Sequence, residues 1–212
     1  MKKLFVLLLA FALSLISVSS AFAFTYEEID IRELYGEPTV EKPSSWAESE
    51  LERAVNLGLV PEYLNKGYTQ TITRAEFCAL AVTLYEKVSG SQIKERKTFN
   101  DTRDVNVQKM GALGVVTGVG NGNFSPDALL TREQAAAILA RLCEALGKPL
   151  DKKETTFSDK DQISSWALGP VGQVQAAGIM SGTGNNRFSP KGNYTREQSI
   201  LTMVRIYDML TR

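Results

Sequence analysis

Three arginines stand at equivalent places in the chain, each directly after a threonine and just before an apolar run: Arg74, Arg132 and Arg196. Two residues after each arginine comes a Glu or a Gln. A threonine followed three residues later by Glu or Gln is a capping box, in which the two side chains satisfy backbone amides at the start of a helix. The pattern therefore predicts three capped helices, with these cap residues: Thr73, Glu76, Thr131, Gln134, Thr195 and Gln198.

The capping box does not explain the arginines. A cation at the first helical position lies beside the positive end of the helix dipole, where it costs about 0.3–1 kcal/mol. One interpretation is that each guanidinium and the free amides at the helix N-terminus together bind an anion. The other is that each arginine is solvated or pairs locally, with Glu133 and Glu197 as neighbouring acids. The residues alone leave both open.

The segments that would position these arginines form a repeat. The three threonines are separated by 58 and 64 residues, and apolar residues follow each of them at helical spacing. A glycine that can end a preceding helix lies upstream of each threonine: Gly58, Gly114 and Gly178. We therefore predict an all-α fold of three helix-loop-helix copies.

The loops between the paired helices are rich in glycine and asparagine. In the second and third copies Phe124 and Phe188 are expected to plug the loop into the core, and Tyr68 takes this place in the shorter first loop. The Gly-x-Gly in these loops does not predict a dinucleotide site, because no strand precedes it and the helix begins too late. The carboxylates that calcium requires are missing. We expect no cofactor and no metal.

Residues 1–23 read as a secretory signal peptide, with two lysines, an apolar run and Ala-Phe-Ala at the end. Residues 24–42 read as a spacer. Without the first 23 residues the net charge is about −2, so neither nucleic acid nor a membrane surface is an expected partner. The chain has no histidine, which excludes His-based catalysis and His-ligated zinc. Cys78 and Cys143 fall on the predicted buried helix faces, and we expect free thiols.

The third copy carries a distinctive run of motifs: Phe157-Ser158-Asp159, Trp166-Ala167, Ala177-Gly178-Ile179-Met180-Ser181-Gly182, Phe188-Ser189-Pro190 and Thr195-Arg196-Glu197-Gln198. This combination resembles the S-layer homology (SLH) repeat. The resemblance implies three repeats, at 43–90, 91–150 and 151–212, packed around a pseudo-threefold axis. It also implies a secreted, non-enzymatic protein of the cell wall or surface layer that binds secondary, often pyruvylated, cell-wall polysaccharide.

Carried over to this sequence, the resemblance gives a set of polysaccharide-binding residues. They are the three arginines, together with Trp46, Asp159, Trp166 and Gly182. The second copy has no tryptophan, and the first lacks the Phe-x-Asp element. We therefore expect one or two competent sites, with every surrounding element retained only in the copy that begins at Phe157.

Two other functions remain as alternatives. One is a surface-layer assembly or protein-interaction subunit that contacts other surface-layer proteins without binding glycan. The other is an enzyme acting on wall glycan, which would need a pair of carboxylates across a cleft. The acids at hand, such as Asp159, Asp161 and Glu197, show no spacing that singles out a pair. We therefore expect no enzyme.

Overall fold

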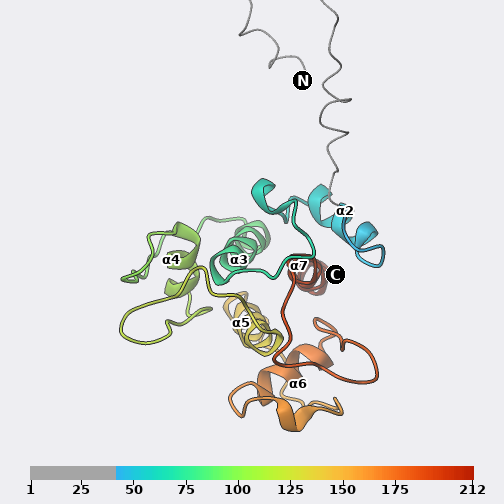
Figure 1. Ribbon diagram of the computed structural model, residues 1–212. Coiled ribbons are helices and arrows are strands. Elements are labelled where there is room, and N and C mark those ends of the chain that lie inside the picture. Colours follow the sequence, from blue (N-terminus) through green and yellow to red (C-terminus); the bar gives the residue numbers. More distant parts are fainter. Residues whose placement is uncertain (1–41) are drawn as a thin grey trace, which may run out of the picture. The chain divides into compact units, whose positions relative to one another are not determined.

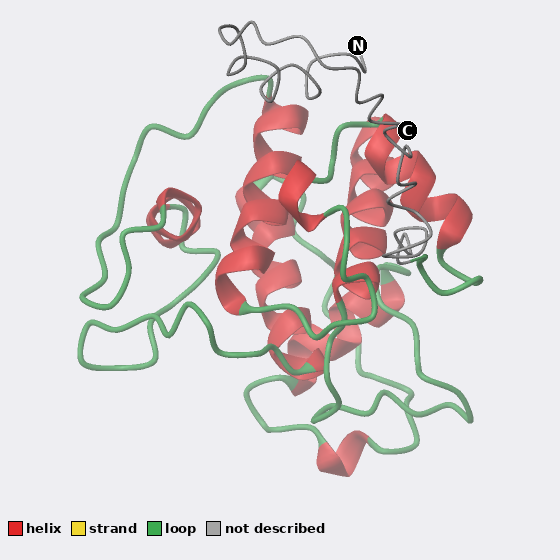
Figure 2. Cartoon of the chain, turned by 45° about the horizontal axis from the view of Figure 1, so that its top comes forward, coloured by secondary structure: helices red, strands yellow, loops and turns green. Residues whose placement is uncertain are grey.

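A computed structural model describes residues 42–212, which form helices and loops and contain no strand (Figure 2). The prediction of an all-α fold is confirmed. The predicted signal peptide and residues 24–41 of the spacer lie outside the described residues. No helix in the described part is long and apolar enough to cross a membrane. The α-helices are α2 (Glu48–Asn56), α3 (Arg74–Ser89), α4 (Val105–Ala112), α5 (Arg132–Ala145), α6 (Leu168–Ala176) and α7 (Arg196–Thr211), and Glu62–Leu64 and Lys160–Gln162 form short 3-10 turns.

The three long helices, α3, α5 and α7, begin at the predicted caps. Each threonine hydroxyl accepts the amide three residues later, at 3.2 Å in α3, 3.4 Å in α5 and 3.3 Å in α7. The Glu or Gln at that position accepts the threonine amide in return, at 3.0–3.4 Å. All three capping boxes are therefore complete, and the six predicted cap residues are confirmed.

The residues just before the three caps meet in a closed cycle of backbone hydrogen bonds. The amide of Ile72 donates to the carbonyl of Tyr194 at 2.9 Å, Tyr194 donates to Leu130 at 3.0 Å, and Leu130 donates back to Ile72 at 3.0 Å. All three side chains are buried. This cycle gives the three copies a common pseudo-threefold axis, with the three long helices grouped around it (Figure 1).

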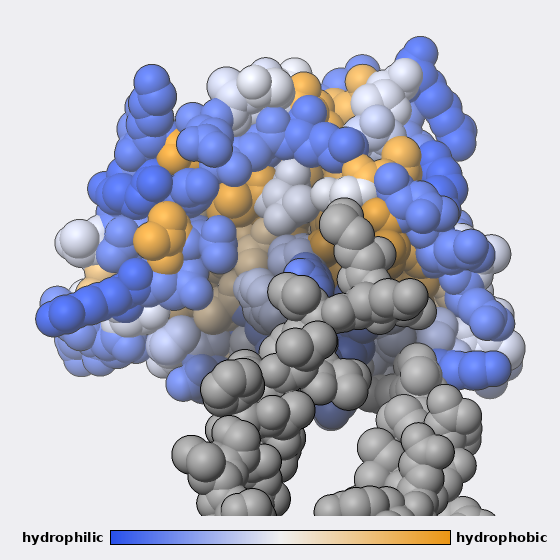
Figure 3. All heavy atoms as spheres, turned by 90° about the horizontal axis from the view of Figure 1, so that it is seen from above, coloured by the Kyte–Doolittle hydropathy of each residue, from blue (hydrophilic) through white to orange (hydrophobic). Residues whose placement is uncertain are grey.

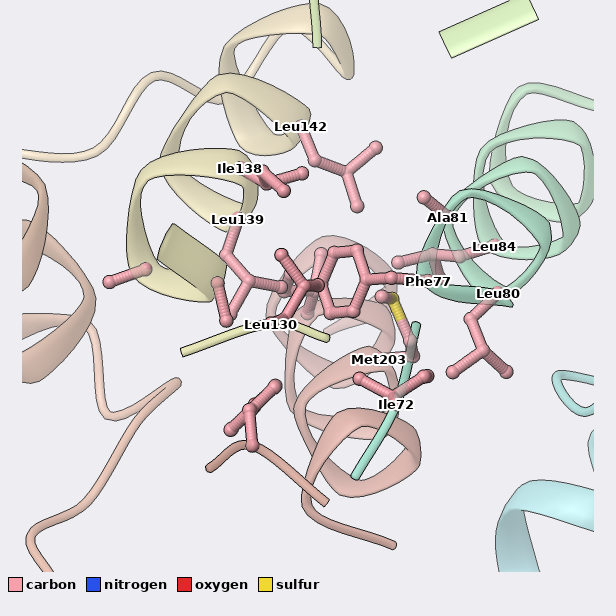
Figure 4. Close-up of a cluster of buried hydrophobic side chains, with 14 of the residues drawn as sticks. Ile72, Phe77, Leu80, Ala81, Leu84, Leu130, Ile138, Leu139, Leu142 and Met203 are labelled. Carbon is pink, nitrogen blue, oxygen red and sulfur yellow. The ribbon is translucent and has the colours of Figure 1, made fainter. Parts of the chain in front are cut away.

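The core lies between the three long helices. Figure 4 shows Phe77 of α3 among Leu139 of α5, Met203 of α7 and Leu130 from the hydrogen-bonded cycle. These side chains are fully or almost fully buried. On the face shown in Figure 3, hydrophilic residues dominate and hydrophobic residues show only in separate patches. The buried core also continues outward to the short helices, where Leu51, Met110 and Val171 are buried.

The two cysteines lie in this packed region. Cys78 of α3 and Cys143 of α5 are both buried and both free, as predicted. Burial raises the pKa of the Cys143 thiol to about 12, and it raises the pKa of Cys78 as well. Both residues therefore act as small apolar side chains.

The short helices pack across the predicted repeat boundaries (Figure 1). Helix α4 packs on α3, α6 packs on α5, and α2 packs on α7. The first helix of each repeat thus lies on the second helix of the repeat before it, and the α2–α7 pair closes the ring. An ion pair between Arg53 and Asp208, with Nη1 to Oδ2 at 2.9 Å, ties this last pair. The predicted repeat boundaries follow the sequence motifs. Each packed pair of a short and a long helix instead joins two neighbouring repeats.

This arrangement predicts that a single repeat does not fold alone. A fragment of residues 91–150 contains α4 without α3 and α5 without α6, so both helices lose the surface on which they pack. We expect the fragment to show little helix by circular dichroism and no cooperative melting. A cooperative transition at the helicity of the intact chain would contradict this packing scheme.

Candidate functional site

Arg74 and Arg132 reach from one repeat into the loop of the next. Arg132 donates through Nε to the carbonyl of Phe188 at 2.7 Å and through Nη2 to that of Ser181 at 2.6 Å. Arg74 makes the same pair of bonds, to Phe124 and Thr117, each at 2.9 Å. Each guanidinium also lies over the phenylalanine ring, at 4.3 Å for Arg74 and 4.8 Å for Arg132. These arginines therefore fasten neighbouring repeats together.

Arg196 makes different contacts because the first loop is two residues shorter. Its Nη1 donates to the carbonyl of Lys66 at 2.7 Å, and its Nη2 pairs with Glu76 at 2.8 Å. Its Nε is buried and has no partner among the described residues. Glu76 takes the place of the second loop carbonyl as acceptor. Arg196 therefore joins the third repeat to the first.

The first loop also corrects the expectation for Tyr68. The carbonyl of Lys66 accepts from Arg196 where those of Phe124 and Phe188 accept from Arg74 and Arg132, so Lys66 occupies the phenylalanine position. The carbonyl of Tyr68 instead accepts the amide of the second helical residue, as those of two loop prolines do. Tyr68 is only partly buried, whereas Leu64 is fully buried. Leu64 is the fully buried apolar side chain of this loop, and Tyr68 packs against the core from a partly buried position.

The amides at the helix N-termini are also bonded to protein. In α5 the amides of Arg132 and Glu133 donate to the carbonyls of Gly192 and Pro190, at 3.0 and 3.1 Å, and α3 and α7 repeat the pattern. The anion interpretation requires these amides to face a ligand. They instead donate to carbonyls in the loop of the neighbouring repeat. The local-pairing alternative is wrong in its partners, because Glu133 and Glu197 bind Ser164 and Ser44.

Asp159 is buried and holds a loop. Its two carboxylate oxygens accept the amides of Phe188 and Ser189 at 2.8 and 2.9 Å, and Ser189 has a left-handed φ of 57°. Burial alone would raise the pKa of Asp159, but backbone amides, led by those of Phe188 and Ser189, together with the charge of Arg187 hold the pKa below its ordinary value. Asp101 makes the same contacts in the second loop. Contact of Asp159 with a glycan stays a prediction, and its burial argues against it.

One groove unites predicted site residues from all three repeats. Trp46 comes from the start of α2, Arg132 from the start of α5, and Gly182 from the loop after α6. The groove has a volume of about 380 Å³, and Trp46 is 57% exposed. A Cβ at Gly182 would lie 2.7 Å from the carbonyl oxygen of Arg187, so the loop requires glycine here. The other lining residues are Met180, Ser181, Thr183, Tyr194, Gln198, Leu201, Thr202 and Arg205.

The lining residues that escaped the sequence analysis include Tyr194, Thr202 and Arg205. The hydroxyl of Tyr194 donates to Thr202 Oγ1 at 3.0 Å, and burial raises its pKa to about 12. Arg205 donates through Nη1 to the carbonyl of Ile179 at 3.0 Å. A signal for Arg205 was present, because an arginine stands ten residues after the threonine in both the second and the third copies.

The third repeat does not carry a complete site of its own, contrary to expectation. Its Gly182 lines a groove with Trp46 and Arg132, while its Arg196 contacts the first repeat. Trp166 is 53% exposed and stands just before α6, which packs on α5. By the equivalence of the repeats, the residues that correspond to Arg132, Ser181 and Arg205 for Trp166 are Arg74, Thr117 and Arg141. The third equivalent place has Thr102 instead of a tryptophan.

Comparison with known proteins identifies the family. Residues 106–136 and 156–198 match the family model of the S-layer homology domain. The chain carries S-layer homology domains. It is 32% identical to an amylopullulanase of Thermoanaerobacterium thermosulfurigenes over 73% of this chain and 9% of the relative. It is 32% identical to an endoglucanase of Bacillus sp. (strain KSM-635), over 62% of this chain and 14% of the relative. An S-layer protein of Bacillus thuringiensis subsp. finitimus is 34% identical, over 47% and 12%.

These matches give a location and a general role. The SLH domain and the surface-layer relatives indicate a place at the cell wall or surface layer and a role in anchoring there. The chain spans only about a tenth to a seventh of the two enzymes. The absence of enzymatic activity and the signal peptide stay predictions.

The buried carboxylate of Asp159 predicts a sensitivity to acid. Because its pKa is lowered in the folded state, its stabilisation is present above the unfolded value of about 3.9 and is lost as the pH falls below it. We expect Asp159→Asn to lower Tm at pH 7 by about 2–8 °C. The gap to the wild type should narrow between about pH 5 and pH 2. A constant gap across a pH series of melting curves would exclude this assignment.

Arg196 is expected to serve stability. Arg196→Ala leaves the carbonyl of Lys66 without its side-chain partner and the carboxylate of Glu76 without its cation, so we expect the free energy of unfolding to fall by about 2–4 kcal/mol. Arg53→Ala is the matched control, because it breaks an exposed ion pair, and exposed ion pairs contribute little to stability. Equal losses for the two variants in urea unfolding would show that Arg196 has no special structural role.

Proposed function

We propose that this protein binds an acidic secondary cell-wall polysaccharide, of the pyruvylated kind, in the groove of Trp46, Arg132 and Arg205. The binding is non-covalent and anchors the protein to the cell wall. The observation that carries the proposal is the groove itself, in which an exposed indole from the first repeat faces two arginines from the second and third.

The donor set of Arg132 fits a carboxylate. A guanidinium has five N–H donors, and the loop carbonyls take one from Nε and one from Nη2. Nη1 has no partner among the described residues, so the terminal edge of the guanidinium is left for a ligand. A pyruvate ketal presents one fixed carboxylate, which such an edge can bind with two parallel hydrogen bonds.

The rest of the groove fits a sugar. The exposed indole of Trp46 offers a flat apolar surface for a sugar ring. Tyr194, Gln198 and Thr202 add polar atoms to the lining, and Arg205 adds a second positive charge. The lining thus combines an apolar surface with polar and cationic groups, which suits a charged sugar.

A polymer can engage more than one groove. Trp166 has the same exposure as Trp46, and Arg74 has the same loop contacts as Arg132. Two moderate sites on one rigid ring give a polymer a higher overall affinity than either site alone. The third position has Thr102 in place of the indole, and both terminal nitrogens of its Arg196 already donate to Lys66 and Glu76. We therefore propose two working grooves.

The two tryptophans provide the direct test. We expect Trp46→Ala and Trp166→Ala each to weaken binding to purified cell walls by about tenfold, and Tm to change little because both side chains are exposed. Walls stripped of their secondary polymer should not bind, and walls with the pyruvate groups removed should bind weakly.

Equal binding to intact and stripped walls, or full binding by the double variant, would refute the proposal. Self-association of the wild type without wall material, abolished by the same substitutions, would favour the assembly alternative.

A further inference from the structure

Two buried glutamates play no part in the groove as described so far. Glu133 and Glu197 stand at the second positions of α5 and α7, and they are only 3% and 4% exposed. The carboxylate of Glu197 accepts both the amide of Ser44 at 3.0 Å and its hydroxyl at 2.9 Å. Glu133 accepts the same two groups of Ser164, each at 3.0 Å. Each glutamate thus binds a serine that lies just before a short helix, Ser44 before α2 and Ser164 before α6.

Each serine begins the turn that bears a tryptophan. The carbonyl of Ser44 accepts the amide of Ala47 at 2.8 Å, and Trp46 lies between them. Ala47 is fully buried, so the turn is fixed at one end by the core and at the other by Glu197. The turn from Ser164 to Ala167 has the same bond, also at 2.8 Å. The position of each half-exposed indole is therefore set by the fixed backbone of its turn.

A comparison of the repeats separates this role from helix capping. The capping boxes of α5 and α7 are complete without the glutamates. The equivalent residue in α3 is Ala75, and the segment it would hold has no tryptophan. There α4 is capped by its own Asp104, which accepts the amides of Asn106 and Val107. Among the three copies, the second position of the long helix holds a buried glutamate only where the turn that it contacts carries a tryptophan.

We propose that Glu197 and Glu133 are positioning residues, which hold Trp46 and Trp166 in place for the ligand. The consequence for binding rests on the proposed function. The position of the indole does not, because it can be measured without any ligand. Glu197 is the simpler case, since Glu133 also pairs with Lys191, whose Nζ donates to Ser164 Oγ at 2.6 Å.

The chain allows each indole to be observed separately. It contains two tryptophans, so Trp166→Phe leaves Trp46 as the sole indole. In this background we expect Glu197→Ala to shift the emission of Trp46 to longer wavelength, lower its anisotropy and increase its quenching by acrylamide. Glu197→Gln should restore the wild-type values, because the amide oxygen can accept the serine N–H and the amide NH2 can donate to the hydroxyl.

Two control variants test the specificity of this effect. Glu133→Ala should leave the emission of Trp46 unchanged and should alter Trp166 in the reciprocal Trp46→Phe background. Arg53→Ala loosens the α2–α7 contact away from the turn and should also leave Trp46 unchanged. If Glu197→Ala does not fold, Ser44→Ala removes one of the two bonds and should give a smaller change of the same sign.

Binding to purified walls that retain their secondary polymer completes the test. Per folded molecule, Glu197→Ala should bind about tenfold more weakly, and Glu197→Gln should bind like the wild type. Unchanged emission in Glu197→Ala, or the same change in Arg53→Ala, would overturn the positioning role. If the emission changes as expected but the wild type binds no wall, the proposed function fails and the positioning of the indole stands.

Discussion

The fold depends on the cycle of three backbone hydrogen bonds that joins Ile72, Leu130 and Tyr194. Each of these residues gives its amide to one neighbour and its carbonyl to the other, so the three hydrogen bonds close into a ring. Their side chains are buried, and loss of one member would leave a donor and an acceptor unpaired in the core. Because a capping threonine follows each of them, the cycle also fixes where the three long helices begin.

This common origin explains the arginine at the first helical position. With the helix starts fixed around one axis, the N-terminal amides and the guanidinium of each helix reach the loop of the next repeat. The positive charge of Arg74 or Arg132 rests on two carbonyl oxygens and a phenylalanine ring, which offsets the unfavourable helix dipole. In the shortened first loop one carbonyl is missing, and Glu76 supplies the acceptor for Arg196. The arginine of the same Thr-Arg motif thus joins neighbouring repeats either through two loop carbonyls or through one carbonyl and a carboxylate.

Much of this structure could be predicted from sequence because it is local. The capping boxes, the buried helix faces and the free thiols of Cys78 and Cys143 depend on spacings within one helix. The grouping of the site residues could not be predicted in this way. Trp46, Arg132 and Gly182 were each recognised, but their meeting depends on the packing of α2 on α7, which no local spacing encodes. Arg205 lies outside the apolar spacing that predicts α7, so that spacing gives no sign of its role.

Under the proposed function, the position of the groove links ligand binding to closure of the ring. The pairs α3–α4 and α5–α6 are each joined by a connecting loop, whereas α2 and α7 are separated by the rest of the chain. Trp46 adjoins α2 at this junction, Arg205 belongs to α7, and Arg132 comes from the neighbouring α5. A polysaccharide that contacts all three adds a bridge where chain connectivity provides none. By mass action such a ligand stabilises the closed ring over any state in which α2 has left α7. The closed ring is therefore most stable when the polysaccharide is bound.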